Sequence, residues 1–134
     1  MTNLQNQYSD YLKESKILRH SVNGLSRFLV LWIIRYHKDI HGYEIIKELD
    51  RFFEVSISEG VLNKTSSSKI YSLLNDMEES ELITGENVIQ ENNKKVKYYS
   101  ITEKGDFILN YLYGRYLSIF NNPQWKLLFD DFDQ

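Results

Sequence analysis

The sequence predicts a mainly α-helical protein that carries one small β-hairpin. Apolar residues recur every three or four positions along most of the 134-residue chain, which is the period of an amphipathic helix. Residues 88–101 depart from this period, because β-forming side chains flank the turn sequence Glu91-Asn92-Asn93. The length and a hydrophobic content of 42% are typical of one soluble globular domain with a modest core.

The first third of the chain predicts two helices. Apolar residues at helical spacing indicate an amphipathic helix over residues 4–18, which must pack on the domain body or on a second subunit. A loose polar arm is the alternative. Ser21–Gly24 predicts a break and a cap, and residues 25–36 then form a strongly apolar core helix. Asp39–Gly42 interrupts that helix, and we expect Gly42 to adopt a turn conformation that other residues rarely take.

The middle of the chain predicts a further helical stripe over residues 43–53, a looser segment over residues 54–68, and then a helix that begins in a serine cluster. The candidates for its N-cap are Thr65, Ser66 and Ser67. Its inward stripe consists of Ile70, Leu73, Leu74 and Met77. Its opposite face, with the two flanking positions, carries Ser68, Ser72, Asn75, Glu79, Lys69 and Tyr71.

This outward face and the hairpin together suggest an interface for DNA. Short hydroxyl and amide side chains can approach base edges without obstruction. Lys94, Lys95 and Lys97 would lie at the tip and on one edge of the hairpin. Such a pair can place a helix in a groove and rest the hairpin on the backbone beside it. The alternative is an ordinary solvated surface, since the stretch from Lys64 to Lys97 has five lysines but six acidic residues.

The C-terminal part predicts a helix that begins at Thr102 and ends at Asn121-Asn122-Pro123. Its apolar residues cover more than one face, and such an excess is usually buried against a partner. We therefore expect a homodimer. A short aromatic tail, with Trp125 in a further helical turn, follows. The residues expected at the dimer interface are Leu4, Tyr8, Leu12, Phe107, Tyr111, Leu112, Tyr116, Ile119 and Phe120.

Composition and motifs argue against several other classes of protein. A net charge of −3 disfavours indiscriminate binding of polyanions. His37 and His41 have the spacing of a metal pair on one helix, but the predicted break separates them, and His41 is expected to cap or pack at the turn. Without cysteines, a phosphate-binding glycine loop or a nucleophile motif, we expect no enzymatic activity, no metal and no cofactor. The chain has neither a signal peptide nor a spanning segment, so a cytoplasmic protein with no membrane partner is expected.

Four motifs in order resemble the PadR-like family of transcriptional regulators. The first is the run from Ile40 to Leu49, which contains the sequence HGYEI. The others are Ile70-Tyr71-Ser72-Leu73-Leu74, Met77-Glu78-Glu79 with Leu82-Ile83, and Lys97 to Gly105. The likeness extends from about Leu25 to Tyr116, most of the chain.

The resemblance implies a winged helix-turn-helix domain that dimerises through its C-terminal helix, binds operator DNA and usually acts as a repressor. The domains would be an N-terminal helix over 1–20, the DNA-binding domain over 21–101 and the dimerisation helix with its tail over 102–134. The recognition helix would match Ser66 to Asn75, and the wing Gln90 to Lys97. The residues expected to contact DNA are Ser66, Ser67, Ser68, Lys69, Tyr71, Ser72, Asn75, Lys94, Lys95 and Lys97.

The sequence departs from the family pattern at several places. The wing uses lysines where the family frequently has arginines, and the segment between Leu49 and Tyr71 is several residues longer than usual, which bears on where the recognition helix starts. Ser72 replaces a frequent proline, and Glu81 replaces the glycine that usually ends the recognition helix. A left-handed Glu81 would cost about 1 kcal/mol. Four lysine contacts in each of two subunits predict a log–log salt slope of about −7 for DNA binding.

Three alternatives to a site-specific regulator stay open. The acidic residues between Glu78 and Glu91 are compatible with an effector-sensing or protein-interaction module that binds little DNA. A DNA-coating architectural role is the third. Trp32 and Trp125 also leave open a flat aromatic effector bound between subunits, although interface packing explains them equally well.

Overall fold

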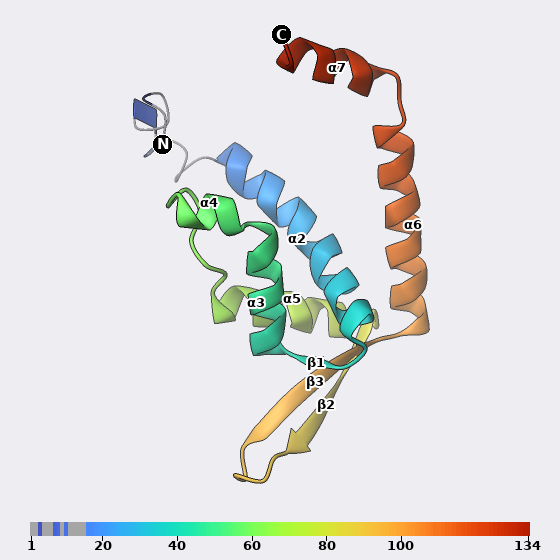
Figure 1. The fold of residues 1–134 in the computed structure, drawn as a ribbon. Coiled ribbons are helices and arrows are strands. Elements are labelled where there is room, and N and C mark those ends of the chain that lie inside the picture. The colour runs from blue at the N-terminus through green and yellow to red at the C-terminus, as the bar shows by residue number, and fades with distance from the viewer. Residues whose placement is uncertain (1–2, 4–6, 9, 11–15) are drawn as a thin grey trace.

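The computed structural model describes residues 3, 7–8, 10 and 16–134 and confirms a mainly helical fold with a small antiparallel sheet. In chain order the elements are α2 (Lys16–His37), β1 (Ile40–His41), α3 (Gly42–Phe52), α4 (Glu54–Ser58), α5 (Ser67–Glu79), β2 (Ile83–Ile89), β3 (Lys95–Ile101), α6 (Glu103–Phe120) and α7 (Gln124–Phe132). Figure 1 shows α2, α3 and α5 packed together, with the hairpin extending beyond this helical body. Helix α6 starts at the root of the hairpin and runs along the side of the body that faces away from α3 and α4, and α7 follows at its far end.

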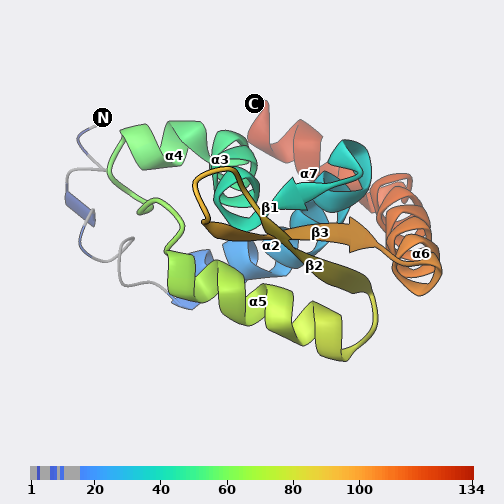
Figure 2. The ribbon, with the colours of Figure 1, turned by 90° about the horizontal axis from the view of Figure 1, so that it is seen from below.

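The sheet has the strand order β1-β3-β2, and both pairs of neighbours are antiparallel. The hairpin register places Gly85 opposite Tyr99 and Ile89 opposite Lys95. The short strand β1 pairs Ile40 with Tyr99. It could not be predicted from the sequence, because a two-residue strand has no period. Figure 2 shows α5 running alongside this sheet.

The core lies where α2, α3, α5 and the sheet meet. Its members are Val30, Leu31, Ile33, Ile34, Ile40, Ile45, Leu49, Ile70, Leu73, Leu74, Met77, Ile83, Tyr99 and Leu109. The predicted inward stripe of α5 is fully contained in this set, which confirms the helical period read from the sequence. By contrast α6 contributes only Leu109 to the core, and α7 contributes no residue. The C-terminal helices therefore leave most of their apolar surface outside the core.

The expected break at Ser21–Gly24 is wrong, because α2 runs without interruption from Lys16 to His37 and crosses the expected boundary at residue 20. Gly24 costs a helix only about 1 kcal/mol, and the apolar residues that follow it outweigh that cost. Ser26 is buried within α2, where its hydroxyl donates a hydrogen bond of 2.8 Å to the carbonyl of Val22. Leu4 and Leu12 lie outside the described residues.

The expected loose segment over residues 54–68 is also partly wrong, since it contains the short helix α4. The break near Asp39 is confirmed, because α2 ends at His37 and α3 begins at Gly42. The predicted helix from Thr102 is confirmed too, and the Thr102 hydroxyl accepts a 3.0 Å hydrogen bond from the Gly105 amide. The aromatic tail forms more helix than expected, a nine-residue α7 rather than one turn.

Candidate nucleic-acid interface

Helix α5 presents a polar face that no other described part of the chain covers. Its N-cap is Ser66, one of the three expected residues, whose hydroxyl accepts a 3.2 Å hydrogen bond from the Lys69 amide. The expected DNA-contacting residues of this helix, including the cap, are all exposed: Ser66, Ser67, Ser68, Lys69, Tyr71, Ser72 and Asn75. The helix therefore offers short hydrogen-bonding side chains to a ligand along its outer side.

The start of α5 is anchored to α3 by one carboxylate. The Oδ1 atom of Asp50 accepts hydrogen bonds from the Thr65 amide at 3.1 Å and from the Thr65 hydroxyl at 2.7 Å. This double contact fixes the chain one residue before the N-cap Ser66. The exposed face of α5 is thus held at a defined angle to α3.

Tyr71 has one side against the protein and the other in solvent. Its ring lies against Gly42 at the beginning of α3, and 42% of the residue surface is exposed. The expected reason for Gly42 is wrong: Gly60 is the glycine with positive φ among the described residues, and Gly42 instead leaves room for the Tyr71 ring. The ring connects the two helices of the helix-turn-helix on their exposed side.

The hairpin tip confirms the predicted turn at Asn92-Asn93. Asn93 has φ 62°, and its amide donates a hydrogen bond of 2.9 Å to the carbonyl of Gln90. The side-chain oxygen of Asn92 accepts a 3.0 Å hydrogen bond from the Lys94 amide. Lys94 and Lys95 are exposed, so their ammonium groups are available at the end of the hairpin.

Lys97 differs from the other two hairpin lysines because it faces the protein. Its Nζ atom lies 2.6 Å from Oε1 of Glu78 in the last turn of α5. The same Nζ atom lies 5.5 Å from the centre of the Tyr99 ring, a cation–π geometry. Lys94 and Lys95 therefore lie together at the tip of the hairpin, as expected. Lys97 lies instead at the root of the hairpin, beside α5.

The sequence reading missed a groove between α3 and the beginning of α5. It has a volume of about 540 Å³, and its basic members are Lys47, Arg51 and Lys64. Lys47 and Arg51 are four residues apart on one helix, a spacing that could have revealed the pair. Three acidic residues, Glu44, Glu48 and Asp50, also line this groove. The acidic residues balance the basic ones, so the groove adds no net positive charge beside α5.

His37 and His41 do not share a helix. His41 is the N-cap of α3, and its Nδ1 atom accepts a 3.3 Å hydrogen bond from the Glu44 amide, which confirms the expected capping role. His37 ends α2, with its Nε2 atom 3.9 Å from Glu48. The described residues contain no group of three or more potential metal ligands. Each imidazole thus has a structural partner in α3.

The predicted interface residues that the structure describes are all on α6, apart from Tyr8. Tyr8, Phe107, Tyr111, Ile119 and Phe120 are exposed, and Leu112 and Tyr116 are half-buried. Tyr116 makes an edge contact with Phe28 of α2, and Phe120 packs against Trp125 with ring centres 4.9 Å apart.

No helix in the described part of the chain is both long and apolar enough to cross a membrane.

The helix pair α3 and α5, followed directly by the hairpin β2–β3, defines a winged helix-turn-helix protein. The chain belongs to the PadR-like family of transcriptional regulators, because residues 30–110 match that family. No curated protein matches the chain at a significant level.

Several solved structures share this fold. A PadR-like transcriptional regulator from Bacillus cereus is 26% identical, with a TM-score of 0.60 over 75% of this chain and 88% of that chain. A PadR family transcriptional regulator from Eggerthella lenta is 22% identical, with a TM-score of 0.60 over 95% of this chain and 93% of that chain. A protein from Thermoplasma acidophilum is 23% identical, with a TM-score of 0.61 over 86% of this chain and 97% of that chain. The last two likenesses support the fold alone.

Proposed function

We propose that the protein is a sequence-specific regulator of transcription that binds double-stranded DNA as a homodimer, acting as a cytoplasmic repressor. The observation that carries this proposal is the uncovered polar face of α5 beside a hairpin tip that exposes Lys94 and Lys95. The family relationship supports a role in transcription. Two α5 helices would enter successive major grooves about 34 Å apart.

The side chains divide by chemistry into base readers and phosphate contacts. Ser67, Ser68, Ser72 and Asn75 can exchange hydrogen bonds with base edges, whereas an ammonium group mainly attracts phosphate. Their exposed positions along one face of α5 support this division. Lys69, Lys94 and Lys95 would hold the protein on the backbone without reading sequence. Tyr71 and Ser66 would meet the backbone near the beginning of α5.

The dimer would be formed by α6 and α7 of the two subunits. Large apolar residues are exposed along both helices, including Phe107 at 68% and Ile119 at 50%. We further propose that α7 contacts α2 of the partner subunit, because their charges are opposite. Helix α2 has four Lys or Arg and no Asp or Glu, whereas residues 124–134, which include α7, have one lysine and three aspartates. Burying this face would remove the apolar surface that the monomer leaves in water.

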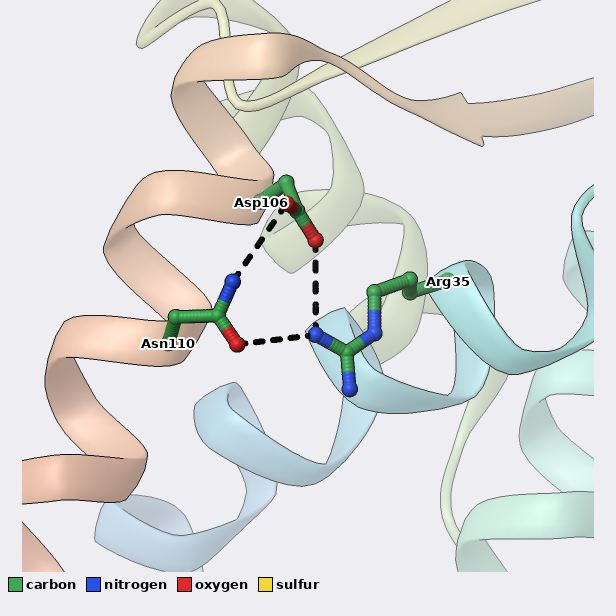
Figure 3. A network of polar contacts seen from close by, with 3 residues as sticks. All are labelled: Arg35, Asp106 and Asn110. Carbon is green, nitrogen blue, oxygen red and sulfur yellow. Dashed lines mark hydrogen bonds and ion pairs between the residues drawn. The ribbon is translucent and has the colours of Figure 1, made fainter.

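A groove beside the proposed interface suits a small aromatic effector. It has a volume of about 390 Å³ and is lined mainly by Phe28, Leu29, Trp32, Phe52, Leu109 and Tyr113. Arg35 and Asn110 supply its polar rim, and Figure 3 shows how both connect to Asp106. The Nη1 atom of Arg35 lies 3.3 Å from Asp106 Oδ1 and 3.2 Å from Asn110 Oδ1. A ligand there would contact α2, α3 and α6 together, and quenching of Trp32 fluorescence by aromatic acids would report binding.

The proposed function is tested by fluorescence anisotropy of the purified protein with its own upstream DNA and a scrambled duplex of equal length. The proposal predicts tighter binding to the upstream duplex. Equal binding to both duplexes would indicate a DNA-coating role instead. Absence of binding to either duplex, with and without candidate effectors, would favour a protein-interaction module.

A further inference from the structure

The root of the hairpin contains an ion pair that connects it to the recognition helix α5. Lys97 projects from β3, and its Nζ atom lies 2.6 Å from Glu78 Oε1. Both side chains are about one-third exposed or less, 35% for Lys97 and 26% for Glu78. Such a short, partly desolvated contact restricts both side chains more than a pair at the surface does.

Two neighbouring residues, Gly85 and Tyr99, accommodate this ion pair. Gly85 lies opposite Tyr99 on the neighbouring strand, and a β-carbon at residue 85 would overlap Cε of Lys97. The glycine therefore leaves room for the lysine chain to cross β2 and reach Glu78. Beneath it, Tyr99 is only 2% exposed. Burial, then the charges of Glu78 and Tyr71, raise the pKa of Tyr99 to about 12. The cation of Lys97 compensates the carboxylate beside this buried phenol.

We propose that Lys97 is a positioning residue whose ion pair with Glu78 fixes the hairpin relative to α5, and that it is not a phosphate contact. The pair joins the element that carries the base readers to the element that carries Lys94 and Lys95. Holding the two at one angle lets both meet DNA at once, so the ordering cost is not incurred on binding. This inference rests on the proposed DNA binding.

Comparing the DNA binding of Lys97→Met with that of Lys95→Met distinguishes a positioning residue from a phosphate contact, because both substitutions remove one positive charge. Both should weaken DNA binding, but only Lys95→Met should reduce the magnitude of the log–log salt slope, by about 2 for a dimer. Lys97→Met should leave the slope unchanged while lowering affinity about five- to tenfold, the scale of coupling between neighbouring groups. An equal change in slope for both variants would overturn the proposal.

Glu78→Gln gives a second test, because simple electrostatics and the positioning role predict opposite changes in DNA affinity. Removal of a negative charge near DNA would by itself strengthen binding. Under the positioning proposal Glu78→Gln weakens binding, and the double variant with Lys97→Met is no weaker than Lys97→Met alone. Tighter binding by Glu78→Gln would contradict the proposal.

Amide hydrogen exchange of the free protein separates this inference from the proposed function. Lys97→Met and Glu78→Gln should speed exchange in residues 83–89 and 95–101, whereas Lys95→Met should not. If the two variants exchange faster but the wild type binds no DNA, the proposed function is wrong, while the inference that the ion pair fixes the hairpin still holds. Unchanged exchange in both variants would refute the fixed hairpin.

Discussion

The phenol of Tyr71 lies directly over Gly42, so that a β-carbon at residue 42 would be 2.6 Å from the phenolic oxygen. This distance is shorter than any van der Waals contact, and Gly42→Ala must therefore displace the Tyr71 ring. Because the ring is partly exposed, it can move outward at a cost of about 1 kcal/mol. We expect weaker DNA binding with a small loss of stability, measured by anisotropy and urea unfolding.

Gly24→Ala is the matched control for Gly42→Ala. No atom lies within 4 Å of a β-carbon at residue 24, which is inside α2. This change should raise the free energy of unfolding by about 0.5–1 kcal/mol and leave DNA binding unchanged. DNA binding by Gly42→Ala equal to that of the wild type would show that the Tyr71 ring position is not required.

Glu81→Gly should stabilise the protein. Glu81 follows the C-cap of α5 with φ 62°, as expected from its place in the family pattern. Its amide donates a 2.9 Å hydrogen bond to the carbonyl of Glu78, and the Leu82 amide donates one of 2.9 Å to Met77. Glycine takes this conformation without strain, so urea unfolding should give a gain of about 1 kcal/mol. Glu79→Gly, within α5, should instead lower the free energy of unfolding by about the same amount. If both substitutions lowered it, the backbone at Glu81 would not be strained.

Stability should fall in alkaline solution because of Tyr99. Its pKa is about 12 in the folded protein, above the ordinary 10 of the unfolded chain. Below pH 10 both states hold the proton, and above pH 10 the unfolded state loses it first. The free energy of unfolding should therefore decrease between pH 10 and 12, by about 1 kcal/mol per pH unit. Tyr99→Phe should flatten this decrease, and a decrease that persists unchanged in Tyr99→Phe would contradict this explanation.

Ile119→Glu should dissociate the proposed dimer, because it places a charge in an apolar interface. Sedimentation equilibrium should give a dimer for the wild type and a monomer for the variant. Val55→Glu is the control, since Val55 is also exposed and belongs to α4, a helix that lies away from α6 in Figure 1. A dimer that persists in Ile119→Glu would place the interface elsewhere.

The elements that the sequence predicted well are those set by local chemistry. The inward stripe of α5 follows from helical period, the Ser66 cap from the preference for hydroxyls, and the Asn93 turn from tolerance of positive φ. Each depends on neighbours within a few residues. These features predicted the helix and the hairpin that carry the candidate interface.

The features that the sequence could not predict depend on tertiary contact. Lys97 finds its partner Glu78 19 residues earlier in the chain, and this requires both the strand register and the packing of α5 on the sheet. The sequence predicts a special backbone conformation at Gly42, because nothing near it in the chain shows that the Tyr71 ring of α5 occupies the space beside it. Gly24 suggested a break because local propensity ignores the apolar residues that hold α2 together.

The salt dependence of DNA affinity tests the central claim most directly, because it counts the phosphates that the dimer neutralises. With Lys69, Lys94 and Lys95 as contacts in each subunit and Lys97 held by Glu78, the log–log slope should be about −5. Replacing Lys94 and Lys95 with alanine should reduce it to about −2, with equal loss of affinity for specific and scrambled DNA. A wild-type slope near zero, or one that the lysine replacements leave unchanged, would contradict the account.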